Sequence, residues 1–297
     1  MGKSGKKVSK LFNKAGKREL SGKVIPMPAD TIADRFISAG WLLSQMDVTA
    51  GNRAYKFVGG RAVTVGIEAM SFKKPVFIGD DVEIFTEIVK QGTTSVAIKV
   101  EAYAECRTGG KKNKVTEGTF SFVHIDDNGK PKPIDSNTVV PKSRKKARAA
   151  EDNDPNFVSN KEPKLKKGQE LSLRTIPFPK NKNYNGDIFG GWVLEQMDNA
   201  GLMRARKEVK GSCAPVAIEA MTFHKPVSEL DEVSFYTEVI RTGNTSVTIK
   251  IESWALREDL KRYEKVTEGV FTYVAIDKDR KPRQIADQGS GSKPSPS

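Results

Sequence analysis

The 297-residue sequence has little of the two residue types that most often mark redox, metal or nucleophilic chemistry. It contains only two cysteines, Cys106 and Cys213, and two histidines, His124 and His224. Two cysteines so far apart form neither a CxxC motif nor a disulfide framework. No Ser-His-Asp or Cys-His grouping is evident either. We therefore expect no structural zinc, no metal, no cofactor and a reducing compartment.

Long hydrophobic runs are also missing. No segment approaches the ~18–20 consecutive apolar residues that span a bilayer, and the N-terminus has no apolar core of a secretory signal. Its lysines favour a mitochondrial presequence only weakly, because such presequences are rich in arginine. We expect a cytoplasmic protein without a membrane span.

The net charge of +13 raises the question of nucleic-acid binding. Residues 1–24 contain eight Lys or Arg and one Glu, and residues 135–170 contain nine basic and six acidic residues. Most of the excess therefore lies outside the segments with hydrophobic periodicity. Such a tail is suited to weak polyanion binding by counterion release, but a solvated linker is the favoured interpretation.

An internal repeat determines the organisation of the chain. Shifting the sequence by 151 residues aligns 22–134 with 173–285 without a gap, and 48 of 113 positions are identical. This number is far above chance and indicates a duplication. We predict a basic flexible tail, a first unit, a charged linker, a second unit and a disordered C-terminal tail, over residues 1–21, 22–134, 135–170, 171–285 and 286–297.

Each unit changes its periodicity once. Residues 191–206 place apolar or small side chains at i, i+3 and i+4 spacing, which predicts a helix. Four strand-like runs rich in Val, Ile, Thr and aromatics follow, at 215–221, 232–241, 245–256 and 265–276. Because the runs are joined by short connections, the sheet should be antiparallel. The fold class is therefore α+β, with a sheet that wraps one central helix.

A glycine-rich loop precedes the second helix. Gly190 and Gly191 allow close approach of a ligand to the backbone, and free amides at a helix start suit a developing oxyanion. Asp187 lies just before the helix and Asp198 about two turns into it. On residue types alone, a tight turn, an N-cap and a solvent-facing carboxylate are the favoured explanation of these residues.

A resemblance to a known family changes that balance. The run Asn185-Gly186-Asp187-Ile188-Phe189-Gly190-Gly191-Trp192, followed by Gln196-Met197-Asp198, resembles the signature of hotdog-fold acyl-CoA thioesterases. Ile218-Glu219-Ala220-Met221 and the segment 266–277 also match, and the resemblance extends over both units. It is strongest to YciA-like enzymes and to the tandem-hotdog cytosolic acyl-CoA hydrolases. The resemblance implies two hotdog units paired as a pseudo-dimer, with thioester sites at the seam between them.

The two copies are not equivalent at this loop. The first copy has Phe36 in place of Asp187 and Ala39 in place of Gly190, although Asp47 matches Asp198. The resemblance therefore implies one working site, assembled from Asp187, Gly190 and Gly191 of the second unit and Asp47 of the first. Either Asp187 or Asp47 would act as general base or nucleophile, and the two glycine amides would hold the thioester oxygen.

The resemblance also implies further contacts with the acyl-CoA substrate. They involve the loop and the turns of both units: Asn185, Phe189, Thr94, Ser95, Thr245 and Ser246. It further implies a homo-oligomer, a trimer of tandem units. A dehydratase is not expected, because neither histidine lies in the loop or on the helix. A non-catalytic acyl-CoA-binding or scaffold protein is the alternative to acyl-CoA hydrolysis.

Overall fold

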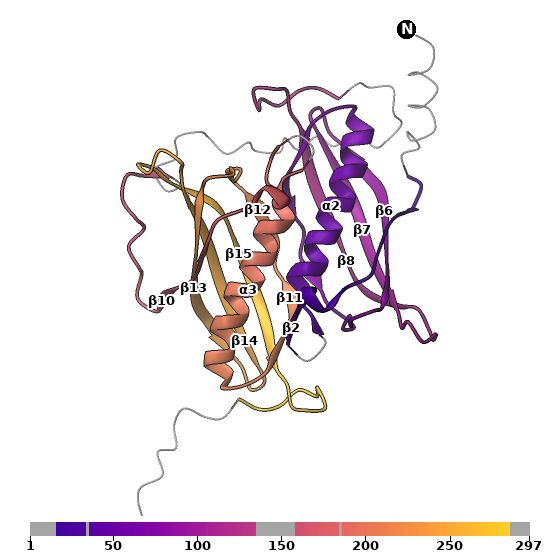
Figure 1. Ribbon diagram of the computed structural model, residues 1–297, viewed down its shortest axis with the longest axis vertical. Helices are drawn as coiled ribbons and strands as arrows, with labels where there is room; N and C mark the ends of the chain where they lie inside the picture. Colours follow the sequence, from indigo (N-terminus) through magenta and orange to yellow (C-terminus); the bar gives the residue numbers. More distant parts are fainter. Residues whose placement is uncertain (1–15, 34–35, 135–157, 184–185, 286–297) are drawn as a thin grey trace, which may run out of the picture.

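The structure, a computed structural model, describes residues 16–33, 36–134, 158–183 and 186–285 and contains two copies of one arrangement (Figure 1). The elements of the first unit are β1 (Glu19–Val24), η1 (Pro28–Asp30), β2 (Thr31–Ala33), β3 (Phe36–Ile37), α2 (Ala39–Val58), β4 (Ala62–Ile67), β5 (Met70–Ser71), β6 (Asp81–Gln91), β7 (Ser95–Glu105) and β8 (Asn113–His124). Those of the second are β9 (Val158–Ser159), β10 (Gln169–Thr175), η2 (Pro179–Asn181), α3 (Gly190–Val209), β11 (Cys213–Ile218), β12 (Met221–Phe223), β13 (Glu232–Thr242), β14 (Ser246–Leu256) and β15 (Tyr263–Ala275).

In each unit a 20-residue helix packs on the inner face of an antiparallel sheet. Met46, Ala50 and Ala54 of α2 are completely buried, and Met197, Gly201 and Ala205 hold the corresponding buried positions on α3. Their spacing of three or four residues puts them on one side of the helix, toward the strands. The predicted fold class, an α+β tandem of hotdog units, is confirmed.

The two sheets continue into one another at the seam. β4 of the first unit pairs with β12 of the second, and β5 pairs with β11, so that thirteen strands form one antiparallel sheet. The longest ladders, β6–β7–β8 and β13–β14–β15, flank this seam on its two sides. Backbone hydrogen bonds thus fix the relative position of the two units.

Two sequence motifs that are identical in both copies meet beside this seam. A Cβ atom on Gly118 would lie 2.6 Å from Met70 Sδ, and one on Gly269 would lie 3.1 Å from Met221 Cε. A side chain at either glycine would displace a buried methionine of a seam strand. The Ile-Glu-Ala-Met motifs pair between the units, Ile67 with Met221 and Ile218 with Met70, and the Val-Thr-Glu-Gly motifs pack against them within each unit.

The central helices α2 and α3 lie side by side across the seam (Figure 1). A Cβ atom on Gly191 would lie 2.7 Å from Ser44 Cα, and one on Gly40 would lie 2.8 Å from Glu195 Cα. The first turn of each helix therefore packs against the second turn of the other, and the two helices run antiparallel. Gly40 and Gly191 are required here because a side chain at either position would collide with a backbone.

The ends of the units differ slightly from the predicted boundaries. β1 begins at Glu19, inside the segment predicted as tail, and β9 and the start of β10 lie inside the segment predicted as linker. Residues 1–15, 135–157 and 286–297 are outside the described residues, so the tail and most of the linker remain predictions. Within the described ranges, no helix has the length and apolarity required to traverse a bilayer.

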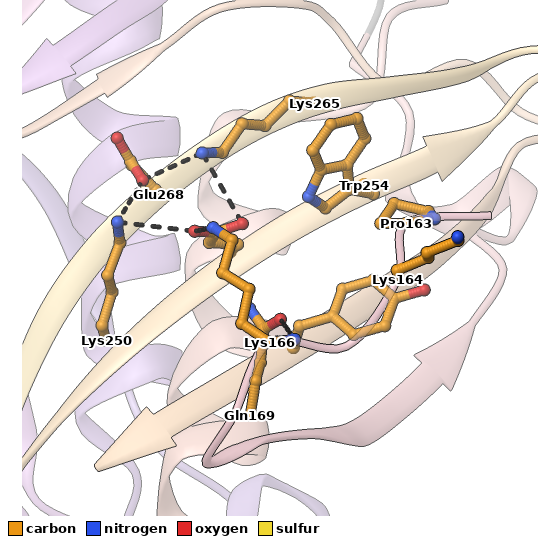
Figure 2. Close-up of a pocket in the computed structure, with 10 residues that line it drawn as sticks. Pro163, Lys164, Lys166, Gln169, Lys250, Trp254, Lys265 and Glu268 are labelled. Carbon is orange, nitrogen blue, oxygen red and sulfur yellow. Dashed lines mark hydrogen bonds and ion pairs between the residues drawn. The ribbon is translucent and has the colours of Figure 1, made fainter. Parts of the chain in front are cut away.

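The segment before β10 lies on the outer face of the second sheet, over a cavity of about 440 Å³ (Figure 2). Lys166 Nζ lies 3.1 Å from Glu252 Oε1, and Lys250 and Lys265 both contact Glu268 at 2.9 Å. The equivalent face of the first unit is covered by Arg18, 2.5 Å from Glu101 and stacked over Phe85. On both outer faces, the charged side chains of the sheet are thus covered by the segment that precedes β1 or β10.

Candidate active site

Asp47 of the first unit contacts the start of α3 in the second unit. It lies two turns into α2 and is buried, with only 2% of its surface exposed. Its Oδ2 accepts a hydrogen bond of 2.7 Å from the backbone amide of Gly191, and its Oδ1 accepts one of 2.7 Å from Thr64 Oγ1. A carboxylate from one unit therefore lies on the positive end of the other unit's helix.

Burial dominates the electrostatics of Asp47. Loss of solvent raises its pKa from 3.8 to about 6, because the ionised form loses hydration. The hydrogen bonds from Thr64 and Gly191 act in the opposite direction, since both stabilise the anion. The result is a carboxylate that is ionised at neutral pH yet more basic than an exposed aspartate.

The start of α3 has no side-chain cap. Its N-cap residue, Phe189, accepts no hydrogen bond with its side chain, and the amide of Trp192 turns back to the Phe189 carbonyl at 3.1 Å. A Cβ atom on Gly190 would lie 3.2 Å from Thr64 Cβ and 3.4 Å from Asp47 Oδ2. Gly190 therefore leaves open the space beside the buried carboxylate.

Asp187 lies in the loop before α3 but is held by a different partner. Arg61 of the first unit donates from Nη2 to both carboxylate oxygens, at 2.8 and 2.9 Å. The loop itself is a tight turn in which the Asn183 amide donates to the Asp187 carbonyl at 2.8 Å. Gly186 takes a φ of +87°, a left-handed value suited to glycine. The structure thus fixes Asp187 across the seam through an ion pair.

The pseudo-symmetric position is occupied by Asp198. Its Oδ2 accepts a hydrogen bond of 2.8 Å from the amide of Gly40, and burial raises its pKa to about 6 as well. Here, however, the second partner is the Tyr273 hydroxyl, 3.1 Å from Oδ1. In addition, Ser38 Oγ caps α2 by accepting from the Trp41 amide at 2.8 Å. The start of α2 is therefore capped by Ser38 of its own unit and by Asp198 of the other.

These differences come from coupled substitutions between the copies. Tyr273 aligns with Phe122, which has no hydroxyl, and Thr64 aligns with Pro215, which has no donor. A Cβ atom on Gly201 would lie 2.2 Å from the Tyr273 hydroxyl, so this glycine makes room for the phenol. Each unit therefore uses a different residue type as the second donor to its buried aspartate.

Comparison with known proteins identifies the family of both units. The model of the family described as "Thioesterase superfamily" matches residues 35–110 and 185–260, one match in each unit. The chain belongs to the thioesterase superfamily.

Two curated relatives each correspond to about one unit. An uncharacterized acyl-CoA thioester hydrolase of Buchnera aphidicola is 44% identical over 131 residues, which are 43% of this chain and 94% of the relative. The acyl-CoA thioester hydrolase YciA of Salmonella typhimurium is 43% identical over 123 residues, 40% of this chain and 92% of the relative. An acyl-ACP thioesterase of Bacteroides thetaiotaomicron, 11% identical, shares the fold over 89% of this chain and 99% of its own, with a TM-score of 0.55.

The structure brings only part of the predicted thioesterase site together. Asp47, Gly190 and Gly191 form one cluster, whereas Asp187 is paired with Arg61. Asn185 and the side chain of Phe36 lie outside the described part of the chain. Phe189 is at the helix start.

The predicted turn residues Thr94, Ser95, Thr245 and Ser246 line neither the cavity on the outer face nor the large groove described below. The amides of Gly92 and Gly243 donate to the carbonyls of Ser95 and Ser246, both at 2.7 Å. The carbonyls of Thr94 and Thr245 accept from the amides of the last residues of β8 and β15, His124 and Ala275. Their contact with substrate remains a prediction.

Three residues of the site were not identified from the sequence. Arg61, Thr64 and Tyr273 are distant in the chain from the loop motif and differ from their counterparts Ser212, Pro215 and Phe122. The alignment of the two copies shows this difference at all three positions. It becomes interpretable only when the strands bring these side chains to the aspartates.

Proposed function

We propose that this protein hydrolyses acyl-CoA thioesters to a carboxylic acid and CoA, at one site between the two units. The observation that carries the proposal is the hydrogen bond from the Gly191 amide to Asp47 Oδ2 across the seam. Curated relatives at 43–44% identity bear the name acyl-CoA thioester hydrolase. The loop signature is complete only in the second unit.

Asp47 is the better candidate for the base. It is buried, its pKa is raised to about 6, and no cation is attached to it among the contacts of the described residues. As a general base it takes a proton from water while the water oxygen attacks the thioester carbon. The carbon–sulfur bond then breaks, and the CoA sulfur leaves with a proton returned from Asp47.

A nucleophilic role for Asp47 would give the same products through an acyl-enzyme anhydride. A single turnover in ¹⁸O-labelled water distinguishes the two routes. Label in the Asp47 carboxylate, or capture of an acyl-enzyme by hydroxylamine, supports the nucleophile, whereas label only in the acid with no captured acyl-enzyme supports the general base.

The Gly190 amide is the proposed donor to the thioester oxygen. The Gly191 amide already donates to Asp47, whereas Gly190 is the first residue of the helix, where an amide has no partner within the helix. Negative charge that develops on the oxygen is favoured at a helix N-terminus. From the sequence we expect both glycine amides to hold the thioester oxygen, whereas this proposal gives that role to the Gly190 amide alone.

Asp187 remains part of the proposed site in a positioning role. Its bidentate pairing with Arg61 links the loop of the second unit to the first, and so sets where the amide of Gly190 points. Replacing Asp187 by alanine should lower kcat strongly. Replacing Arg61 by methionine should lower it in parallel, because either change breaks the same link.

Alanine variants test the one-site model. Release of free thiol from a panel of acyl-CoAs of graded chain length should be abolished in Asp47→Ala and preserved in Asp198→Ala. Full activity in Asp47→Ala would refute the cross-seam site. Binding of a thioether analogue without any thiol release by the wild type would instead support the non-catalytic acyl-CoA-binding or scaffold alternative.

Two further expectations accompany this function. The trimer of tandem units predicts a mass of three chains in analytical ultracentrifugation. Weak polyanion binding by the basic tail predicts salt-sensitive retention on nucleic acid that is lost when residues 1–24 are deleted.

A further inference from the structure

A large groove lies on the side of the seam where the loop motif has been lost. Its volume is about 1080 Å³, and it extends between the start of α2, the end of α3 and the ends of β11 and β15. Ala39 and Pro215, which replace Gly190 and Thr64 of the proposed active site, are both part of its wall. The groove therefore corresponds by pseudo-symmetry to the place where a substrate approaches the intact site.

The groove combines an apolar wall with a strongly basic rim. Leu42, Phe72, Val76 and Leu202 contribute to the apolar part. Only one acidic residue, Asp277, is in the lining, and its Oδ1 accepts from the Lys281 amide at 2.8 Å. The lining contains seven basic residues from both units: Lys73, Lys74, Arg206, Lys210, Lys278, Arg280 and Arg283.

Three of these cations have structural contacts, and one of them, Lys73, lies 4.0 Å from Glu117. Arg283 donates to the Val209 carbonyl at the end of α3 at 2.7 Å, and Arg280 lies 4.8 Å over the Phe77 ring. Arg206, Lys210 and Lys278 are instead exposed side chains on the rim. These three can turn toward an anion at little structural cost.

Four of the seven cations are specific to this side, whereas Lys74 and Arg283 align with Lys225 and Lys132 on the other. In the 151-residue alignment of the two copies, Arg206 corresponds to Tyr55 and Lys210 to Gly59. Lys278 corresponds to Asp127, and Arg280 corresponds to Gly129. Four cations on this side are thus replaced by neutral residues and one acid on the other side. A decayed site with no ligand has no need of such a concentration of positive charge, whereas phosphate recognition by Lys and Arg does.

We propose that this groove is a second, non-hydrolysing binding site for acyl-CoA. The class of ligand rests on the proposed function, but the groove itself does not depend on catalysis. The basic rim meets the phosphates through charge-assisted hydrogen bonds, and the apolar wall covers the acyl chain. The volume is sufficient for part of a ligand of this size.

The same substitutions explain why a ligand is held there without being hydrolysed. Ala39 places a methyl group where the intact site has only Gly190. Asp198 Oδ1 is bonded to the Tyr273 hydroxyl, Ser38 caps the helix start, and Pro215 removes the hydroxyl that Thr64 supplies. The Asp198 carboxylate is present, but one of its oxygens is bonded to Tyr273 of the same unit.

Equilibrium binding of a hydrolysis-resistant S-alkyl-CoA thioether tests the proposal. Calorimetric titration of the wild type should give two equivalents per chain. The double variant Arg206→Glu/Lys278→Glu should bind one equivalent with unchanged affinity and the second at least about tenfold more weakly, because two charge-assisted contacts are reversed. Its kcat for acyl-CoA hydrolysis should stay within about twofold of the wild type.

A matched control changes charge elsewhere. Lys111→Glu/Lys261→Glu makes the same change in net charge at exposed turns and should still bind two equivalents. CoA alone and a free fatty acid alone, titrated separately, should each bind the groove more weakly than the thioether.

Three outcomes would overturn the proposal: one equivalent in the wild type, two equivalents unaffected by the double variant, or a fatty acid that binds as tightly as the thioether. Failure of the proposed function appears differently, as an absence of thiol release with binding intact. Loss of thiol release in the double variant would place catalysis in this groove and refute both proposals.

Discussion

Replacing Asp47 by asparagine should make the protein more stable and inactive. The carboxylate is buried beside a helix start, and burial raises its pKa from 3.8 to about 6. A carboxyl group whose pKa is higher in the folded state binds its proton more tightly there, so ionisation opposes folding. Asparagine keeps the shape of the side chain and an acceptor for the Gly191 amide but cannot ionise.

The magnitude follows from the shift. Two pKa units at about 1.36 kcal/mol each correspond to roughly 3 kcal/mol of unfolding free energy. Below about pH 4, Asp47 is protonated in both folded and unfolded chains, and the variant should match the wild type. The gain should appear as the pH rises through 4 to 6 and be complete above about pH 6.

Urea unfolding at pH 4.5 and 7.5 measures this gain, and thiol release measures activity. Asp198→Asn is the matched control, because burial raises the pKa of Asp198 to about 6 in the same way. It should gain similar stability and keep its activity. An Asp47→Asn variant that is no more stable at pH 7.5 would refute the burial argument, and one that hydrolyses acyl-CoA normally would refute the catalytic assignment.

Three further predictions concern the same two sites. Gly190→Ala, which places a methyl group 3.2 Å from Thr64 Cβ, should lower kcat at least about tenfold with little change in urea midpoint. The pH profile of kcat/KM should fall below about pH 6 with one ionisation, because Asp47 must be unprotonated to act as base, and the fall should be absent in any variant with residual activity that lacks this carboxylate. Tyr273→Phe removes one donor to buried Asp198 and should cost roughly 1–2 kcal/mol of stability at pH 7.5 without changing kcat.

The repeat and the loop motif made much of the fold predictable. A 151-residue self-match with a single change from helical to strand-like periodicity indicated two α+β units, and the helix predicted over 191–206 is found at Gly190–Val209. The asymmetry of the loop, with Phe36 and Ala39 in the first copy, was also visible in the sequence. Periodicity and motif identity are local properties, so a single sequence carries them.

The partners of each aspartate were not predictable in this way. Asp187 and Asp47 were equivalent candidates for the base in the sequence, but Asp187 is paired with Arg61, 126 residues away, and Asp47 contacts Gly191, 144 residues away. Which charges become neighbours depends on the register of β4 against β8 and on the antiparallel contact of α2 and α3. These are properties of packing that no spacing within one motif encodes.

The sequence by itself determined that the protein is a duplicated α+β unit with one complete loop, because these features rest on repetition and local pattern. Only the tertiary structure decided that Asp47 is the buried, basic carboxylate, that Asp187 is held by a cation and that Tyr273 confines Asp198. The physical reason is that hydration and hydrogen-bond partners set the pKa of a carboxylate, and both depend on which distant residues surround it.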